Sequence, residues 1–187
     1  VWRERNNRID QVFDAFPTPT WTGVAAKYLS LLSVTGALLL VLAVCGVIVQ
    51  TVKGYTHYEL GLYFNYLFLI KFITFANTAA LAFFFQALLN NKYVGHGIMI
   101  GYYVLYTWLP SMGFEHKIYR FNSAPSLTYS DMNQYGRFLE PYYTFKFYWL
   151  SIAIVMLVAA LLFWQRGVLT DWKGRIEEFK RRISKTH

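Results

Sequence analysis

The four histidines are the side chains of this chain best suited to hold a metal ion or a haem, and their spacing favours neither. They are His57, His96, His116 and His187, so no two stand three or four residues apart, and no HExxH pattern occurs. A catalytic zinc site needs a cluster of His, Cys or carboxylate ligands. A bis-histidine haem needs two ligands at one depth, and only His57 and His116, both expected in loops, could share a level. We therefore predict no metal site and no cofactor.

Motifs of nucleotide-dependent and hydrolytic enzymes do not occur either. The chain has no GxxxxGK[ST] phosphate loop and no GxSxG turn around a nucleophilic serine. Its single cysteine, Cys45, stands in an apolar run and has no second cysteine for an intrachain disulfide. We expect no enzymatic activity from these residues themselves.

Lys71 is the one ionisable residue that we place deep inside an apolar span. A charge at that depth is costly and marks a functional candidate by default. Asn65, Asn77 and Gln86 share the span, but Asn65 and Lys71 are not on one narrow face, so no continuous polar track is predicted. Two interpretations stay open: Lys71 reaches the interface or a partner from a missing helix, or it takes part directly in transport.

The composition indicates the elements that must position these residues. Apolar residues make up 56% of the 187, aromatic residues 20% and charged residues only 15%. Soluble domains carry about one quarter charged residues. The net charge of +8 comes from basic residues at the ends of apolar runs, which indicates membrane orientation rather than nucleic-acid binding.

Four apolar runs are long enough for membrane helices, which need about 20 residues. We therefore predict an all-α integral membrane protein. Its transmembrane helices are expected at 24–52, 60–89, 94–112 and 142–165.

Lysine and arginine in the flanks orient the four predicted spans. Twelve stand on the side of both chain ends, and five stand on the other side: Lys53, Lys117, Arg120, Arg137 and Lys146. By the positive-inside rule both ends are cytoplasmic. We expect a multi-pass protein of the bacterial inner membrane.

Two further segments complete the predicted organisation of a single membrane domain. The outer segment 113–141 is rich in tyrosine and phenylalanine, which favour the interface. We expect a compact cap pressed on the outer surface, with or without a short helix that dips in, or an ordered connector with no role of its own. The tail 168–187 is expected to form an amphipathic cytoplasmic helix that rests on anionic lipid or leads into another domain. Because the first residue is valine, we expect a piece of a longer protein.

The opening stretch, 1–21, is predicted to be an amphipathic helix that Pro17 and Pro19 end before the first span. Its three arginines and three acids cancel to no net charge. A helix that adheres to lipid is usually rich in Lys and Arg, whereas mixed charges suit a protein partner. We therefore expect this helix to dock on another protein.

Several stretches resemble a family of bacterial type-2 ABC exporter permeases that are fused to a zinc aminopeptidase domain. They are VWRERNNRIDQVFDAFPTPTWTGVAAK, GYTHYELGLY, LLNNKYVGH, GFEHKIYRF, SAPSLTYSDMNQYGRFLEP and WQRG. The first is similar to the coupling-helix region of such permeases, a short cytoplasmic helix followed by a proline and the next span.

This resemblance implies that the chain is part of one permease half of an ATP-driven exporter. Arg3, Glu4, Arg5, Asp10 and Asp14 would then contact a separate ABC-type ATPase subunit, which would hydrolyse the ATP. Other permease helices or a second permease half, and membrane lipid, would be the remaining partners. Any peptidase domain would follow downstream and cannot be assigned to these residues.

Two other functions stay open. The chain could be a membrane anchor module for a fused or tethered peptidase, without transport of its own; an ATPase partner would favour the exporter, and a lone peptidase would favour the anchor. A haem- or quinone-binding respiratory subunit is the third hypothesis, which an absorption spectrum of the purified protein tests.

Overall fold

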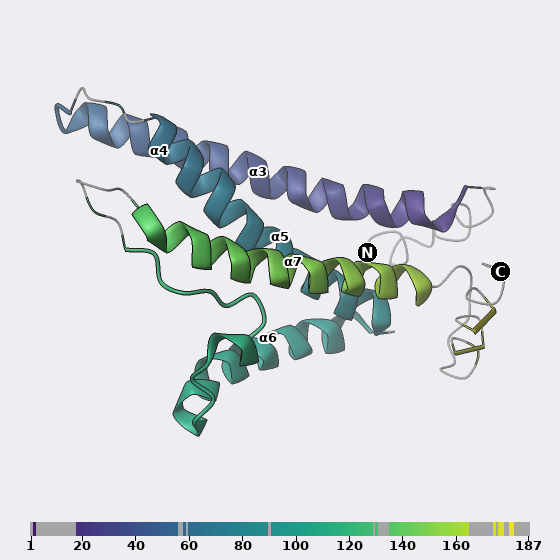
Figure 1. Cartoon of the computed structure of the whole chain (residues 1–187). Helices are drawn as coiled ribbons and strands as arrows, with labels where there is room; N and C mark the ends of the chain where they lie inside the picture. The colour runs from purple at the N-terminus through teal and green to yellow at the C-terminus, as the bar shows by residue number, and fades with distance from the viewer. Residues whose placement is uncertain are drawn as a thin grey trace.

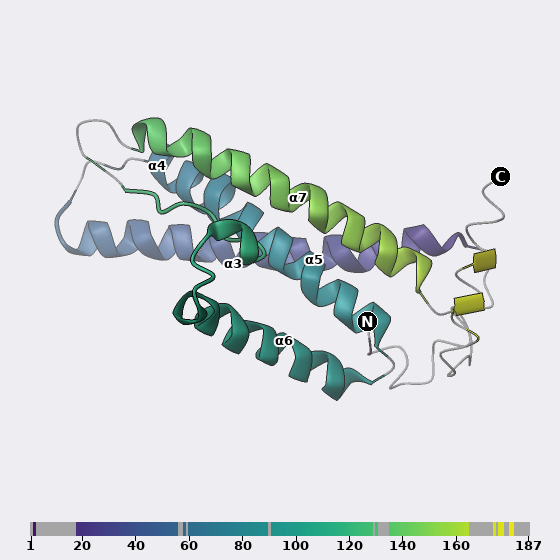
Figure 2. The same ribbon diagram turned by 60° about the horizontal axis from the view of Figure 1, so that its bottom comes forward.

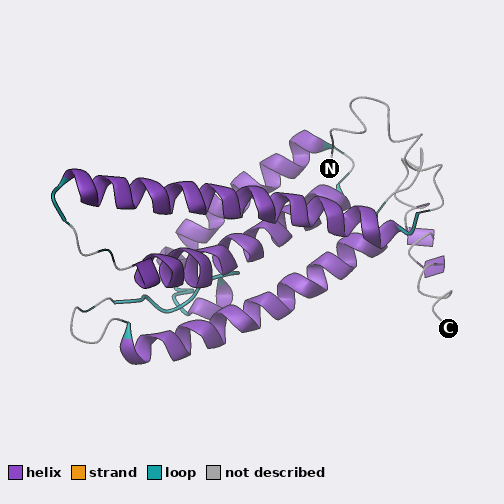
Figure 3. Cartoon of the chain, turned by 90° about the horizontal axis from the view of Figure 1, so that it is seen from above, coloured by secondary structure: helices purple, strands orange, loops and turns teal. Residues whose placement is uncertain are grey.

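The computed structural model describes Trp2, residues 18–55, Tyr58, residues 60–89, residues 91–128, Ser130, residues 135–164 and five residues of the tail (174, 176, 177, 180 and 181). The predicted opening helix and most of the predicted tail helix therefore lie outside the described residues. Figure 3 draws the described elements as helices joined by loops.

The first described helix, α3 (Thr20–Val52), is 33 residues long, or about 50 Å at 1.5 Å per residue. It begins directly after Pro19, whose ring holds φ near the helical value and whose missing N–H costs nothing at this position. It ends at Val52, and Gly54, two residues later, has a φ of 76°. Glycine adopts this left-handed conformation without the strain that a Cβ would cause.

The second long helix is a continuous run, Leu60–Leu88, built from three parts. These are α4 (Leu60–Phe64), the π-helical segment η1 (Asn65–Lys71) and α5 (Phe72–Leu88). π-Helical turns are rare and frequently occur at functional sites. The wider turn of this helix therefore ends on Lys71, the residue that the sequence singles out.

The shorter helix α6 (Lys92–Trp108) follows and continues into a 3₁₀ turn, η2 (Leu109–Met112). The side chain of Asn91 caps α6 by accepting a 2.9 Å hydrogen bond from the backbone N–H of Tyr93. α6 has 17 residues, which gives a length of about 26 Å.

The last long helix, α7 (Leu139–Leu162), is preceded by the 3₁₀ turn η4 (Gly136–Phe138). Another such turn, η3 (Lys117–Tyr119), lies in the segment between α6 and α7.

In the part of the chain that the structure describes, three helices are long and apolar enough to cross a membrane: Thr20–Val52, Leu60–Leu88 and Gly136–Leu162. The described elements are all helical, and these three helices support the prediction of a membrane-embedded, multi-pass protein. The predicted fourth span, 94–112, is not among these three.

The long helices form one bundle in which α7 runs parallel to α5, and α3 runs antiparallel to both (Figures 1 and 2). We call the end of the bundle that holds the start of α3 and the ends of α5 and α7 the near end. The opposite end, where α3 ends and α7 begins, is the far end. α5 packs against α3, α6 and α7. α6 packs chiefly on α5 and diverges from the bundle in both views.

The apolar core lies at the near end. Val24, Phe83, Ala87 and Ala160 are buried there, and the ring of Trp164 stacks on Phe83 with 5.9 Å between centroids. The small alanines let α3, α5 and α7 approach closely, which is how helices pack where lipid surrounds them.

We expected the segment between α6 and α7 to form a cap on the outer surface. In the structure it returns alongside the bundle before it reaches the start of α7 (Figures 1 and 2). Its residues 121–123 bond to α5, α6 and α7. The bonded position Thr74 lies about 20 Å along its helix from Leu60. Part of the predicted cap is therefore inserted between helices.

Candidate functional site

A buried polar cluster joins this inserted segment to α5 and α7. We define it by five residues, Thr74, Asn77, Thr78, Asn122 and Lys146, which are linked by hydrogen bonds through four of their side chains and the backbone carbonyl of Thr74. Most of the surrounding helix surface is apolar, so these polar groups must satisfy one another.

Asn122 is the centre of the polar cluster. Its backbone has a φ of 63°, a left-handed conformation that asparagine tolerates better than most residues. Its side-chain Nδ2 donates to the carbonyl oxygen of Thr74 at 2.7 Å and to Oγ1 of Thr78 at 2.9 Å. Its Oδ1 accepts from Nζ of Lys146 at 2.9 Å and from Nδ2 of Asn77 at 3.3 Å. Every hydrogen-bonding group of this amide is therefore used.

Thr74 and Thr78 supply the groups of α5 that accept hydrogen bonds from Asn122. The hydroxyl of Thr74 donates to the carbonyl oxygen of Ile70 at 3.0 Å, and the hydroxyl of Thr78 donates to that of Thr74 at 3.0 Å. Each proton is thereby directed to the backbone of the same helix. The oxygen of Thr78 stays available to accept from Asn122.

Lys146 brings a charge into the cluster from α7. Only 3% of its surface is exposed. Its Nζ donates to the backbone carbonyl of Asn122 at 2.7 Å and to Oδ1 of the same residue at 2.9 Å. The ammonium also lies 5.4 Å from the ring centroid of Tyr142. A single residue of the inserted segment thus supplies both oxygens that hold this ammonium.

Asn77 is fully buried, with 0% of its surface exposed. Its Nδ2 reaches Asn122, but its Oδ1 receives no hydrogen bond from the described residues. A buried acceptor without a donor costs free energy. Within the described part of the chain, the cluster therefore leaves the Oδ1 of Asn77 without a donor.

Neighbouring bonds hold the inserted segment on both sides of Asn122. The indole Nε1 of Trp149 donates to the carbonyl oxygen of Ser123 at 2.7 Å, and the hydroxyl of Tyr102 donates to that of Phe121 at 3.0 Å. The rings of Phe121 and Trp149 also meet edge to face, 5.2 Å apart. The position of Asn122 is thus fixed by bonds from α6 and α7 as well as by its own.

Lys71, the residue predicted from the sequence, lies at the edge of this cluster rather than in it. It is half-buried, and its Nζ lies 5.0 Å from the ring centroid of Tyr66. The ring of Tyr66 stacks on Tyr135 at 6.3 Å.

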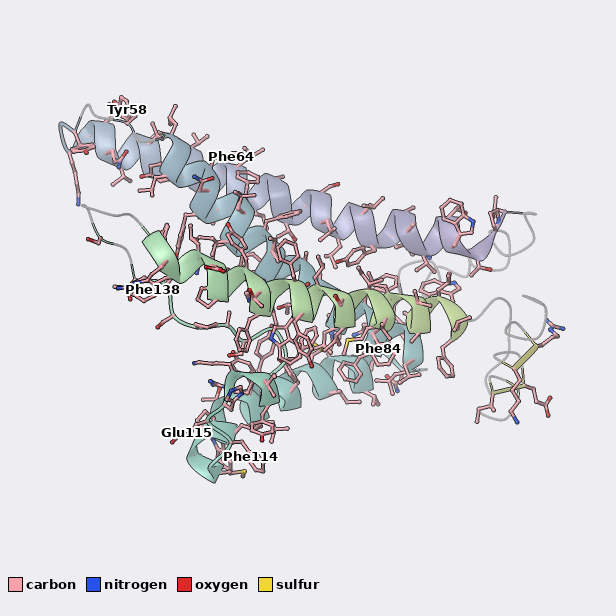
Figure 4. The ribbon with its side chains drawn as sticks, viewed as in Figure 1. Tyr58, Phe64, Phe84, Phe114, Glu115 and Phe138 are labelled. Atoms are coloured by element: carbon pink, nitrogen blue, oxygen red, sulfur yellow. The ribbon has the colours of Figure 1, made fainter. Side chains whose placement is uncertain are left out.

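Carboxylates do not balance these two lysines in the part of the chain that the structure describes. Glu115, Glu140 and Glu177 are the acids there, and none forms an ion pair with Lys71 or Lys146. Figure 4 shows Glu115 beyond the end of α6, away from α3 and α7. Among the described residues, the oxygens bonded to Lys146 belong to the uncharged Asn122.

The other polar residues of the predicted second span do not converge on the cluster. Asn65 is exposed. Gln86 lies at the near end, where its Nε2 is 3.3 Å from Nδ1 of His96 and its Oε1 accepts from the indole of Trp2. The first described residue of the opening stretch thus contacts the near end of the bundle. Arg3, Glu4, Arg5, Asp10 and Asp14 lie outside the described residues.

Sequence reasoning missed Lys146 and Asn122. Lys146 was counted with the outer basic residues although the predicted span 142–165 contains it, and α7, which begins at Leu139, places it inside the helix. The aromatic residues on both sides of Lys146, in YYTFKFYW, are the signal that could have placed it inside the helix. Asn122 was interpreted as a turn former, and it does take a turn conformation, but nothing local indicates its partners.

The site can hold positive charge. Its titratable groups are Lys146 and the adjacent Tyr142, with Lys71 at its edge, and no group of three His, Cys, Asp or Glu side chains gathers among the described residues. A lysine in a low-dielectric setting is a strong centre for an anion or for a polar acceptor. We searched protein-family models, curated proteins and solved structures, and none of the three comparisons found a match.

Proposed function

We propose that this chain is the membrane part of an ATP-driven exporter of the ABC type, in the bacterial inner membrane. The observation that carries the proposal is the polar cluster with its buried Lys146 between α5 and α7. Ionisable residues inside membrane bundles are costly, and they commonly mark the path of a substrate or ion. An inert anchor has no need for such a group.

The path would lie where the inserted segment meets the helices. Residues 121–123 are bonded to three helices and fill the space between them. Movement of α7 against α5 would change the bonds between Lys146 and Asn122, since the two partners belong to different elements. Transporters alternate access by such movement of one group of helices against another.

In this proposal α6 is the fourth span. Together with η2 it covers Lys92–Met112, a length of about 33 Å when the tighter rise of the 3₁₀ turn is included. That is close to the roughly 30 Å of a hydrocarbon core. Both ends of the chain would then lie in the cytoplasm, and other permease helices or a second permease half would cover the diverging α6.

The opening stretch would dock on the ATPase subunit. Its contact between Trp2 and Gln86 lies at the near end of the bundle, which is the cytoplasmic end in this proposal. Arg3, Glu4, Arg5, Asp10 and Asp14 supply the mixed charges expected of a protein contact. ATP-driven closure of the subunit would move this stretch and, through Gln86, the end of α5.

The test is a charge reversal on that stretch in the full-length protein, reconstituted with its ATPase subunit. We expect the Glu4→Lys, Asp10→Lys double variant to bind the ATPase roughly tenfold more weakly or worse, because opposite charges become like charges at the contact. Binding and membrane-dependent ATP hydrolysis are measured on the same vesicles. Glu177→Lys, a reversal on the exposed tail, is the matched control.

Equal binding and equal ATP hydrolysis in the double variant and the control would overturn the docking proposal. A full-length protein that binds no ATPase would instead leave the membrane-anchor function for a fused or tethered peptidase.

A further inference from the structure

We propose that Gln86 couples the protonation of His96 to the contact between the opening stretch and the bundle, and that this contact is therefore a pH-sensitive switch. The side chains form one chain of hydrogen bonds at the near end. The indole Nε1 of Trp2 donates to Oε1 of Gln86, and Nε2 of Gln86 lies 3.3 Å from Nδ1 of His96. The chain joins the opening stretch, α5 and α6, and it does not require an ATPase partner.

The direction of each bond follows from the chemistry of the side chains. An indole N–H can only donate, so the oxygen of the Gln86 amide faces Trp2. The NH₂ group of the amide, which is a donor, then faces His96. Nδ1 of His96 must therefore be the nitrogen that accepts, which leaves the ring neutral with its proton on Nε2. The chain of bonds thus requires a neutral histidine.

Protonation of His96 reverses this pattern. Both nitrogens of a charged imidazole are donors, so Nδ1 and the NH₂ group of Gln86 become two donors that face each other. The amide regains a bond by turning its oxygen toward the ring, which presents its NH₂ group to the indole of Trp2 and breaks that bond. Histidine changes charge between pH 5 and 8. The contact is therefore kept at the upper end of this range and weakened at the lower end.

The packing of Gln86 on α6 favours a turn of the amide in place. A Cβ at Gly95 would lie 2.8 Å from Nε2 of Gln86 and 2.9 Å from both Cδ and Oε1. Because the three atoms are almost equally distant, the amide lies flat against the backbone of α6, in space that a glycine leaves open. The NH₂ group and the oxygen are similar in size, so a half-turn exchanges them within the same space.

The other titratable groups around His96 are few among the described residues. α6 packs chiefly on α5, and residues 80–88 of α5 are alanine, leucine, phenylalanine and Gln86 only. Lys92, one turn before His96 on α6, lies over the ring of Tyr93 at 5.0 Å. Lys27 of α3, also at the near end, lies over a tryptophan ring at 4.8 Å. The charged residues of the opening stretch lie outside the described residues. The test variants keep all of these groups, so a difference between variants reports on the switch.

Two substitutions separate the titration of His96 from the polarity of Gln86. His96→Asn keeps an acceptor, because the side-chain oxygen of asparagine is bonded to Cγ as Nδ1 of histidine is, but it cannot take up a proton in this pH range. Gln86→Glu replaces the NH₂ group by a second acceptor oxygen, so the carboxylate can accept from Trp2 and from a protonated histidine at once.

His116 offers a matched control. It is exposed, as His96 is, and its Nδ1 also accepts a hydrogen bond, from the backbone N–H of Ile118 at 3.2 Å. It follows the opposite end of α6. His116→Asn therefore removes the same kind of acceptor and the same titration without touching Gln86.

The experiment uses the full-length protein in nanodiscs without an ATPase. NMR measures how fast the indole proton of Trp2 exchanges with water, and its peak is the one absent from Trp2→Phe. Each exchange rate is divided by that of His96→Asn at the same pH, which cancels the intrinsic pH dependence of exchange. We expect a ratio close to one at about pH 8 that rises to roughly fivefold at about pH 5, the factor for one lost hydrogen bond. His116→Asn should follow the unmodified protein, and Gln86→Glu should stay close to one.

Three results would overturn the switch. A ratio that stays close to one at both pH values means that the protonated ring turns to solvent and leaves the amide in place. An equal rise in Gln86→Glu means that the charge, and not the polarity of the amide, loosens Trp2. Loss of the rise in His116→Asn means that another histidine controls it. The substituted side chains are exposed or half-buried, so the buried core stays intact, and the absence of an ATPase separates this result from the docking test.

Discussion

α3 and α7 are both long apolar helices, yet they differ in what they bury. α3 keeps only Val24 and Leu39 buried over its 33 residues. α7, with 24 residues, buries a lysine and a tryptophan, Lys146 and Trp149, together with three smaller or aromatic side chains. The apolar surface of α3 therefore meets lipid or other helices, whereas α7 carries one side of a polar site. Hydropathy alone makes the two helices look alike.

The largest test of this difference is the substitution of Asn122 by leucine. The change removes the two hydrogen bonds that the amide of Asn122 donates to Thr74 and Thr78. It also removes the side-chain oxygen that accepts from Lys146 and Asn77. Finally, it places a branched side chain at a φ of 63°. Leaving a buried charge under-compensated costs about 3 kcal/mol or more. We expect the free energy of unfolding, measured by denaturant titration in micelles, to fall by at least that amount.

Asn91→Ala is the control for Asn122→Leu. Asn91 also bonds through its side chain, but only as the cap of α6, and loss of a cap costs about 1 kcal/mol. Equal losses in the two variants would show that the polar cluster does not hold the bundle together.

The second test replaces a buried alanine of α5, the helix on which α7 packs, and an exposed alanine of α3 by leucine. Ala80 of α5 has 0% of its surface exposed, and Ala37 of α3 is exposed. Ala80→Leu must push α7 or α3 away, so we expect a loss of about 1–3 kcal/mol in the free energy of unfolding. Ala37→Leu adds apolar surface where nothing is displaced and should stay within about 0.5 kcal/mol. A large loss from Ala37→Leu would mean that α3 is also packed against a partner in the purified protein.

The sequence predicted the helices better than the site, and the reason is physical. Long uncharged runs exclude most structures other than a membrane helix, so the three long helices follow from hydropathy alone. The polar cluster depends on contacts between residues far apart in the chain, such as Asn122 with Thr74, 48 positions apart. Such contacts leave no local pattern.

Lys71 and Lys146 show what a local sequence pattern can and cannot reveal. Lys71 was found because it interrupts an apolar run. Lys146 was missed because it was counted as a charge of the outer flank, although the predicted span 142–165 contains it, as α7 does. The predicted docking residues of the opening stretch lie outside the described residues, so their role stays a prediction.

The smallest expected effect concerns how α3 touches the second helix. A Cβ at Gly46 would come within 2.8 Å of the ring of Tyr63, whereas a Cβ at Gly36 would meet Phe72 at an ordinary 3.8 Å. Alanine is favoured over glycine in a helix interior by about 1 kcal/mol. We therefore expect Gly36→Ala to raise the free energy of unfolding slightly, and Gly46→Ala to lose that gain because Tyr63 must move.

We expect Gly46→Ala to lower the free energy of unfolding by only about 1 kcal/mol relative to Gly36→Ala, because Tyr63 can move its ring into adjacent space. Its ring lines a wholly apolar groove of about 310 Å³ between α3 and the second helix, beside Val47 and Phe64. Denaturant titration of Gly36→Ala and Gly46→Ala in the same micelle gives the difference directly. If Gly46→Ala is as stable as Gly36→Ala, the contact between Gly46 and Tyr63 is loosely packed. α3 then differs from α7 in packing density as well as in the polarity of its buried residues. If it loses several kcal/mol, α3 is packed as tightly as α7, and only the polar cluster separates the two helices.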